Sequence, residues 1–157
     1  MLRHIVVLDL LLGPILSRFY HSIQKPVGYL LNLYNKLQPN TTLNLEIKVK
    51  DDHTEKGQEI IRKAKKICKY KKTDNLIFSS FNHNIIGLDG YLADNKDKLK
   101  SALGKLKTNN YLIIDYNLKD YKVLKRVNNP VIAYNVPETE NLSQLGGIKA
   151  AITDFAN

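Results

Sequence analysis

Residues 43–49 alternate strictly between apolar and polar side chains, in the order Leu-Asn-Leu-Glu-Ile-Lys-Val. A period of two residues is typical of a β-strand. The segments on either side have helical spacing instead. Pro26 opens a predicted helix that continues to residue 37, and Asp52, with Glu55 three residues later, is expected to cap a second helix.

Strand and helix patterns continue to alternate along the rest of the chain. Short apolar runs predict strands at residues 75–80, 90–93, 111–115, 131–134 and 150–153. Helices are expected at residues 95–107, 118–127 and 137–147. The helix at 118–127 is predicted to turn Tyr121 and Leu124 inward. Such alternation indicates an α/β fold with a parallel sheet, either an open doubly wound sheet or a (β/α) barrel.

The N-terminal segment, residues 1–25, differs from the rest in being apolar and irregular. Its apolar run is interrupted by Asp9 and Pro14, and it is too short for a transmembrane span of about 20 residues. A basic start followed by apolar residues resembles a secretory signal, but no small-x-small cleavage site follows. We therefore expect a cytoplasmic protein in which this run is a buried strand or helix, or an apolar remnant of something longer.

Composition narrows the class of protein. The chain has 157 residues, enough for one domain, and a single cysteine, Cys68, which excludes an internal disulfide. Its formal net charge is +9, which favours polyanions. Twenty of the 24 basic residues are lysine, and the scarcity of arginine argues against a dedicated nucleic-acid binder. The four histidines are scattered and give no zinc-site spacing.

Candidate functional residues lie where the predicted strands end, because side chains gather there in parallel α/β folds. Glu46 and Lys48 share one face of their strand, and they form either a buried ion pair or an oxygen ligand for a hard cation beside a phosphate-binding lysine. Ser79, Ser80 and Phe81 end the next strand, and the two hydroxyls are expected either to cap the next helix or to bind a ligand. Asp154 ends the last strand and is expected either to bind a ligand or to cap the chain locally.

Four segments, taken in order, resemble the glycerophosphodiester phosphodiesterase family. Residues 43–48 (LNLEIK) resemble a strand motif of that family, and residues 77–82 (IFSSFN) are similar to the serine-serine-phenylalanine strand end that follows it. Residues 131–136 (VIAYNV) resemble the penultimate strand, where Trp-Thr is usual in place of Tyr134-Asn135. Residues 151–156 (AITDFA) resemble the closing Thr-Asp-aromatic-Pro motif, with alanine in place of the proline.

The resemblance implies a partial (β/α) TIM-type barrel of the PLC-like phosphodiesterase kind, with residues 26–157 forming its C-terminal five or so strands. Family members use Ca²⁺ or Mg²⁺ and two histidines to hydrolyse glycerophosphodiesters to an alcohol and glycerol 3-phosphate. Carried over to this sequence, Glu46 is a metal ligand and Lys48 holds the phosphate. Tyr134 replaces the tryptophan of the substrate wall, and Ser80, Phe81 and Asp154 join the substrate-binding set.

The chain also departs from the family pattern. It has no His-Arg-Gly strand end, no Glu-x-Asp pair before Glu46 and no His-Asp motif, so no complete catalytic set is present. We therefore expect a truncated phosphodiesterase-like chain that is inactive alone, with doubtful cation binding. One alternative is half of a split enzyme, completed by an N-terminal partner chain or by homo-oligomerisation. Another is a non-catalytic module that binds polyanions through the lysine-rich helix at residues 59–72.

Overall fold

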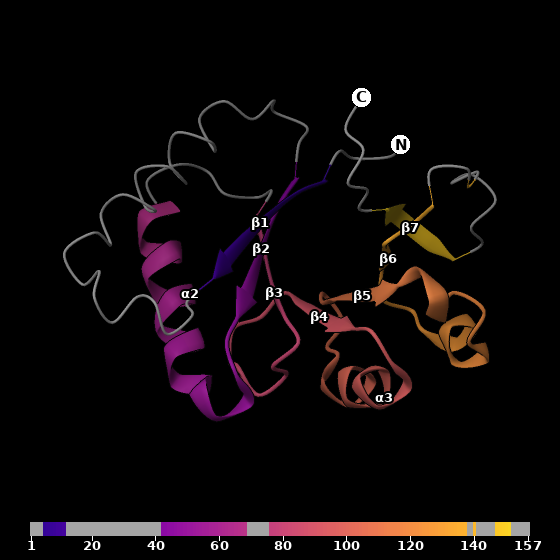
Figure 1. Cartoon of the computed structure of the whole chain (residues 1–157), viewed down its shortest axis with the longest axis horizontal. Coiled ribbons are helices and arrows are strands. Elements are labelled where there is room, and N and C mark those ends of the chain that lie inside the picture. The colour runs from indigo at the N-terminus through magenta and orange to yellow at the C-terminus, as the bar shows by residue number, and fades with distance from the viewer. Residues whose placement is uncertain (1–4, 12–41, 69–75, 138–139, 141–146, 152–157) are drawn as a thin grey trace.

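The fold is a single parallel sheet with helices and turns between the strands (Figure 1). The computed structural model describes residues 5–11, 42–68, 76–137, 140 and 147–151. The sheet strands within these ranges are β1 (Ile5–Leu11), β2 (Thr42–Lys48), β3 (Leu76–Ser80), β4 (Gly90–Ala93), β5 (Tyr111–Asp115), β6 (Val131–Tyr134) and β7 (Ile148–Ala151). This element order confirms the predicted α/β class.

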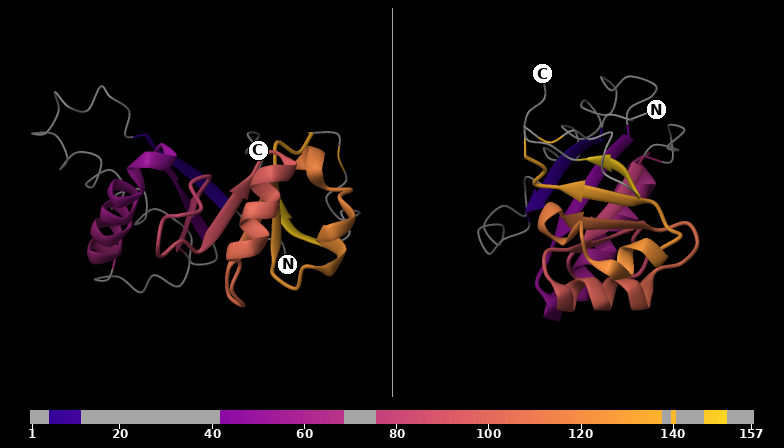
Figure 2. Two further views of the ribbon diagram at one scale, coloured as in Figure 1. Left: turned by 90° about the horizontal axis from the view of Figure 1, so that it is seen from below. Right: turned by 90° about the vertical axis from the view of Figure 1, so that its right-hand side faces the viewer.

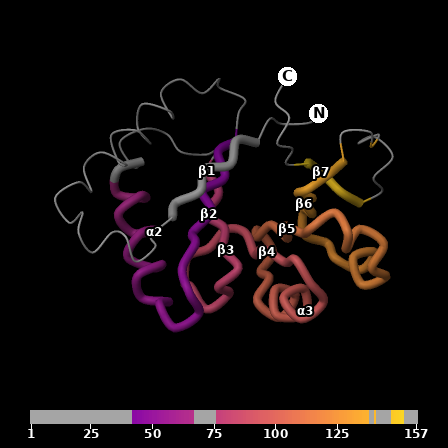
Figure 3. Tube along the Cα trace, viewed as in Figure 1, coloured from indigo at the N-terminus to yellow at the C-terminus, as the bar shows by residue number. Residues whose placement is uncertain are grey.

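The strands lie in the sheet in their order along the chain, and every neighbouring pair is parallel. Figure 1 shows the sheet curled into an open arc, with the helices on its convex side. The side views in Figure 2 and the trace in Figure 3 show the same progression from α2 to β7. The architecture is thus a curled half-barrel, in which β2–β7 supply six strands, about one more than expected, and β1 adds a seventh at the edge.

Two apolar clusters occupy the two faces of the sheet. The convex cluster packs Leu45 and Phe78 of the sheet against Ile61 of α2 (Thr54–Cys68) and Leu99 of α3 (Lys96–Lys105). The concave cluster consists of strand residues alone: Ile77, Leu92, Ile113, Ile132 and Ala150. Because successive side chains of a strand point to opposite faces, the register of each strand decides which residues reach the concave face.

Both long helices form as the sequence predicts, but α2 begins differently. A short 3-10 helix, η2 (Asp51–His53), precedes α2, and the Thr54 hydroxyl donates to Asp51 O at 3.1 Å. Asp52 is exposed inside η2, so its predicted capping role is wrong. In α3, the Asn95 side chain caps the helix by accepting a hydrogen bond from Lys98 N at 2.9 Å.

The predicted helix at residues 118–127 is wrong. Two 3-10 helices, η3 (Tyr116–Leu118) and η4 (Lys122–Arg126), occupy this region instead. The Asp115 carboxylate accepts a hydrogen bond from Asn117 N at 2.9 Å and draws the backbone into a tight turn, which competes with helix formation. Tyr121, predicted to point inward, is 41% exposed, and the Lys96 ammonium lies 5.4 Å from the centre of its ring.

The other strands agree with the sequence patterns to within one or two residues. The N-terminal apolar run contains a strand, β1, which pairs with β2. The last strand, β7, lies two residues earlier than predicted. The helix predicted at 26–37 and most of the one predicted at 137–147 fall outside the described residues.

Gly90 allows close packing between β3, β4 and β5, which gives a test of the fold. A Cβ at Gly90 would lie 2.8 Å from Ile113 Cδ1, and Ile113 is fully buried. We expect Gly90→Ala to lower the free energy of unfolding by about 1–3 kcal/mol in urea denaturation. Gly104→Ala is the matched control, because nothing lies within 4 Å of its Cβ position in α3. The control is expected to raise stability by about 0.5–1 kcal/mol, and equal effects of the two variants would contradict the packing.

Candidate functional site

The site is built on the alternation of β2. Leu43, Leu45 and Ile47 belong to the convex cluster, so the residues between them point to the concave face. Asn44 and Glu46 are both buried there. The sequence analysis predicted this separation of the polar residues of β2 from its apolar ones, and the structure confirms it.

Register brings other polar residues beside Glu46. Ser79 of β3 is the Cα partner of Glu46 on one side, and Asp9 of β1 is its partner on the other. Asp9 was not among the predicted site residues, because it lies in an apolar run of uncertain role. A carboxylate in the middle of a strand-length apolar run was the available signal for it.

Two buried oxygen atoms of the concave face have no partner among the described residues. These are Asn44 Oδ1 and Ser79 Oγ, on side chains that are 2% and 0% exposed. An unsatisfied buried polar atom costs about 1–3 kcal/mol, so such atoms in a folded protein call for an explanation such as a water, an ion or a ligand. Asn44 was not predicted as a site residue, whereas Ser79 was among the strand-end residues expected either to cap a helix or to bind a ligand.

Lys48 follows Glu46 on the same face, nearer to the end of β2. Its ammonium lies 3.9 Å from Glu46 Oε2, and its side chain is 36% exposed, against 12% for Glu46. At this distance and exposure the attraction is modest. The pair therefore leaves the ammonium in reach of solvent at the rim of the sheet.

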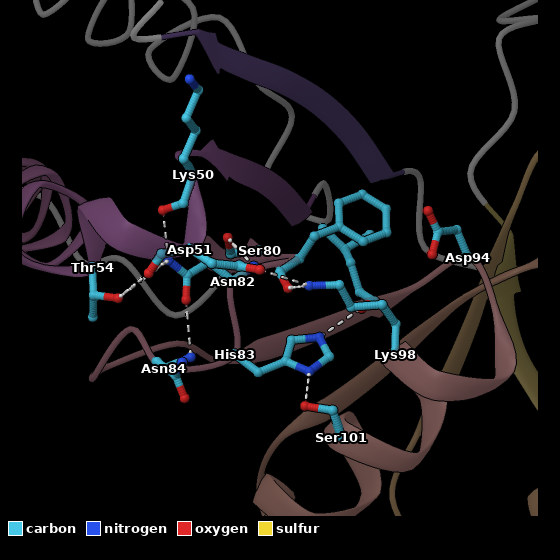
Figure 4. Close-up of polar contacts among 12 residues, drawn as sticks. Lys50, Asp51, Thr54, Ser80, Asn82, His83, Asn84, Asp94, Lys98 and Ser101 are labelled. Atoms are coloured by element: carbon cyan, nitrogen blue, oxygen red, sulfur yellow. Dashed lines mark hydrogen bonds and ion pairs between the residues drawn. The ribbon is translucent and has the colours of Figure 1, made fainter.

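Ser80 and Asn82 tie the loop after β3 to the end of β2 (Figure 4). The Ser80 hydroxyl donates to Ile47 O at 2.7 Å and accepts from Asn82 N at 3.0 Å. The Asn82 amide nitrogen donates to Lys50 O at 3.0 Å. Ser80, predicted to bind substrate, therefore has its hydroxyl in contacts that hold the loop.

Phe81 and Tyr134 form an aromatic corner that packs against the concave cluster. Their ring centres are 6.4 Å apart, and the ring planes meet at 87°, an edge-to-face arrangement. The Tyr134 hydroxyl donates to Ala93 O at 3.3 Å. The sequence analysis placed both residues in the substrate-binding set, and the structure brings them together.

Carboxylates surround the Tyr134 phenol. Its pKa is raised well above the usual value, first by burial and then by the negative charges of Asp115, Asp94 and Glu46. Asp115 is the Cα partner of Tyr134 across β5 and β6, and its Oδ2 accepts from Asn135 Nδ2 at 2.8 Å. Asn135 has a φ of 55°, a left-handed conformation that asparagine tolerates better than most residues. The phenol thus stays protonated and acts as a hydrogen-bond donor.

His83 is buried, but it faces α3 rather than the concave face. Its Nε2 donates to Leu92 O at 2.7 Å, and its Nδ1 accepts from the Ser101 hydroxyl at 2.9 Å (Figure 4). The ring also packs edge-to-face on Tyr91, with ring centres 5.6 Å apart. Burial is the main cause that lowers the pKa of His83, so the ring is neutral at pH 7.

The predicted site residue Asp154 lies outside the described residues. Within the described ranges, no three His, Cys, Asp or Glu side chains gather as a metal site would require. A metal ion here would therefore need neutral oxygens such as Asn44 Oδ1 and Ser79 Oγ as well.

Among the described helices, none combines the length and apolar character that crossing a bilayer demands.

Comparisons with known proteins do not identify a family. No family model matches the sequence, and a search of curated proteins finds no significant match. The site is therefore interpreted from its own geometry and from the sequence motifs.

The contacts of His83 predict a pH dependence of stability. The pKa of His83 is lower in the folded state than the value of about 6.5 in an unfolded chain. Below about pH 6.5 the unfolded state therefore binds more protons, and stability falls as the pH falls. We expect the urea midpoint of the wild type to drop between pH 7.5 and pH 5.5. In His83→Gln this drop should be smaller, and an equal drop in both proteins would contradict a neutral buried imidazole.

Proposed function

We propose that this chain forms the phosphodiester-binding part of a barrel of the glycerophosphodiester phosphodiesterase type. The observation that carries the proposal is the position of Glu46 and Lys48. Both lie on the concave face of a curled parallel sheet near the carboxyl end of β2, and α/β folds of this kind bind their ligands at the carboxyl ends of their strands. The four sequence motifs supply the assignment to this family.

A divalent cation fits beside Glu46. On the same concave face are Asn44 Oδ1 and Ser79 Oγ, two buried oxygens with no partner among the described residues, and Ser79 is the Cα partner of Glu46. Ca²⁺ and Mg²⁺ prefer oxygen ligands of this kind and complete their shells with water or substrate. These residues would hold the ion, which when bound supplies a Lewis acid that polarises a phosphoryl oxygen.

Lys48 and the aromatic corner supply binding rather than proton transfer. The Lys48 ammonium at the rim is suited to neutralise a phosphate charge, as a point charge of this kind does in many phosphate sites. Phe81 and Tyr134 form an apolar wall on the same face of the sheet. Together these residues would orient a small phosphodiester against the concave face.

Acid–base catalysis is the part that the described site does not supply. General acid–base catalysis is worth about 10²–10⁴-fold, and histidine is its most frequent agent. His83, buried among described residues, has both ring nitrogens occupied by Leu92 O and Ser101 Oγ. We therefore propose that the chain alone binds phosphodiesters without hydrolysing them, and that a partner chain or a second copy would bring the missing histidines.

Cation binding tests the role of Glu46. The chain has nine tyrosines and no tryptophan, so tyrosine-sensitised Tb³⁺ luminescence can report an ion in a Ca²⁺-type site. We expect Glu46→Gln to weaken Tb³⁺ binding by about tenfold or more, with Ca²⁺ competing in the wild type. Glu59→Gln is the matched control, because Glu59 is exposed on α2 and pairs with Lys63 at 2.6 Å. Equal affinities of the two variants would overturn the cation site.

Substrate tests then separate binding from turnover. Calorimetric titration with glycerol 3-phosphate in the presence of Ca²⁺ is expected to show binding that Lys48→Ala weakens. Incubation with glycerophosphocholine is expected to release no choline from the chain alone. Absence of glycerol 3-phosphate binding would refute the proposed function. Hydrolysis that Glu46→Gln abolishes would refute only the inactivity of the isolated chain.

A further inference from the structure

The hydroxyl of Ser101 is hydrogen-bonded to the imidazole of His83 (Figure 4). Ser101 belongs to α3 on the convex side of the sheet and is exposed, whereas His83 lies in the loop after β3 and is buried. Ser101 Oγ and His83 Nδ1 are 2.9 Å apart. A hydroxyl on an exposed residue is therefore in contact with a base that the fold holds in the interior.

The second ring nitrogen of His83 decides the direction of this hydrogen bond. Its Nε2 lies 2.7 Å from Leu92 O, and a carbonyl oxygen only accepts hydrogen bonds. Nε2 therefore carries the ring hydrogen, which leaves Nδ1 as the acceptor in the neutral imidazole. The Ser101 hydroxyl is the donor, so its proton points at the nitrogen that can take it up.

Packing holds the His83 imidazole in this orientation. The ring meets the Tyr91 ring edge-to-face, with centres 5.6 Å apart and planes at 84°, and Leu92 O fixes its far edge. The loop is anchored by the preceding residue, Asn82, whose amide nitrogen donates to Lys50 O at 3.0 Å. A hydroxyl, an adjacent base and a group that orients the base are the parts of an activated serine nucleophile.

Two other hydroxyls of the described chain have a different kind of acceptor. The Ser80 hydroxyl donates to Ile47 O, and the Thr54 hydroxyl donates to Asp51 O. A backbone carbonyl does not take up a proton at neutral pH, so these two contacts only hold the backbone. The contact of Ser101 can also transfer a proton, because a neutral imidazole is a base at pH 7.

Charges of both signs lie close to the Ser101 hydroxyl. Lys105 comes four residues after Ser101 and Asp97 four residues before it, so both share its face of α3. The Lys105 ammonium is suited to attract the oxyanion that forms when a hydroxyl attacks a carbonyl group. Because Asp97 repels anions at the same surface, the arrangement favours an uncharged ester over a charged one.

We propose that Ser101 and His83 form a nucleophile and base that accept an acyl group from small uncharged carboxylic esters. Ser101 Oγ bonds to the carbonyl carbon of the ester, and its proton passes to His83 Nδ1. The bond from that carbon to the alcohol oxygen then breaks, and the alcohol leaves with the proton. Water repeats these steps on the acylated serine and releases the carboxylic acid. The pair lies outside the concave face, so this activity is separate from the proposed function.

Diisopropyl fluorophosphate is the probe for the nucleophile, because it is uncharged and forms a stable product with activated serines. Ser101 Oγ would displace fluoride at phosphorus while His83 takes the proton. Trypsin releases residues 101–105 (SALGK) as one peptide, in which Ser101 is the only residue with a hydroxyl. Mass spectrometry of this peptide therefore assigns the adduct to Ser101, and its absence from the wild type would overturn the proposal.

The matched control carries a serine on the same helix without a base. The double variant Ser101→Ala/Gly104→Ser keeps one hydroxyl in the same tryptic peptide, at a position where nothing lies within 4 Å of the Cβ. We expect the wild type to be labelled about 100-fold faster or more, the lower end of the range that general-base catalysis supplies. Equal labelling rates would overturn the pair.

Several groups of neighbouring elements face the His83 ring. Burial is the main cause that lowers the pKa of His83, and the hydrogen bond to Leu92 O raises it. The charges that act on the ring are those of Lys98 and Lys105 of α3 and of Asp51 of η2. Burial raises the pKa of the Tyr91 phenol, which therefore stays protonated near neutral pH.

The pH profile of labelling tests His83 without a variant at a buried position. Since the pKa of His83 lies below about 6.5, the rate is expected to be constant from pH 6.5 to pH 8.5 and to fall at lower pH. An unassisted hydroxyl reacts through its alkoxide, whose population rises about tenfold per pH unit. A tenfold rise per unit in the wild type would refute the role of His83.

Ester turnover tests the acyl transfer itself. The release of p-nitrophenol from p-nitrophenyl acetate is expected to fall, once the probe has reacted, to the rate of Ser101→Ala. Equal rates before and after labelling would refute acyl transfer by Ser101. His83→Gln, with its fold checked by circular dichroism, is expected to be labelled as slowly as the matched control, and a folded variant with the wild-type rate would refute the pair.

Discussion

The structure depends on β2 being buried on both of its faces. Leu43, Leu45 and Ile47 are fixed against the convex cluster, and a shift of one residue would exchange every apolar side chain for a polar one. Apolar packing therefore sets the register of β2. This register places Asn44 and Glu46 on the concave face, even though burying their polar groups costs free energy. Unpartnered oxygens in such a position lower stability by about 1–3 kcal/mol each, a cost that ligand binding can offset.

The two consecutive serines at the end of β3 are both buried, and they point to opposite faces of the sheet. Ser80 bonds Ile47 O and Asn82 N, so it joins the end of β2 to the following loop. Ser79 points the other way, beside Glu46 on the concave face. Because Ser80 and Asn82 hold the loop, Phe81 is presented to Tyr134 at a fixed angle. The edge-to-face contact of Phe81 and Tyr134 therefore depends on the hydrogen bonds that join the end of β2 to the loop after β3.

Features that depend on hydrophobic periodicity were predicted from the sequence. Features that depend on side-chain hydrogen bonds or on the register between strands were missed. The alternation in β2 correctly placed Glu46 and Lys48 on one face. Phe81 and Tyr134, predicted from the strand ends, pack edge to face. The helix predicted at 118–127 was wrong because the Asp115 carboxylate accepts a hydrogen bond from Asn117 N and favours a tight turn there. Apolar spacing does not reveal this effect. Asp9 was linked to the site only through its pairing with Glu46, and the register between distant strands is not encoded locally.

The distribution of charge differs between the rim of the sheet and the aromatic corner. A net charge of +9, carried largely by lysines, creates a field that draws anions to the molecule. That field is screened over about 8–10 Å in physiological salt, so it does not decide what happens inside the aromatic corner. There Asp94 and Asp115 dominate, while Lys48 stands at the rim beside Glu46. An anionic group is therefore expected to bind at the rim beside Lys48 rather than inside the aromatic corner.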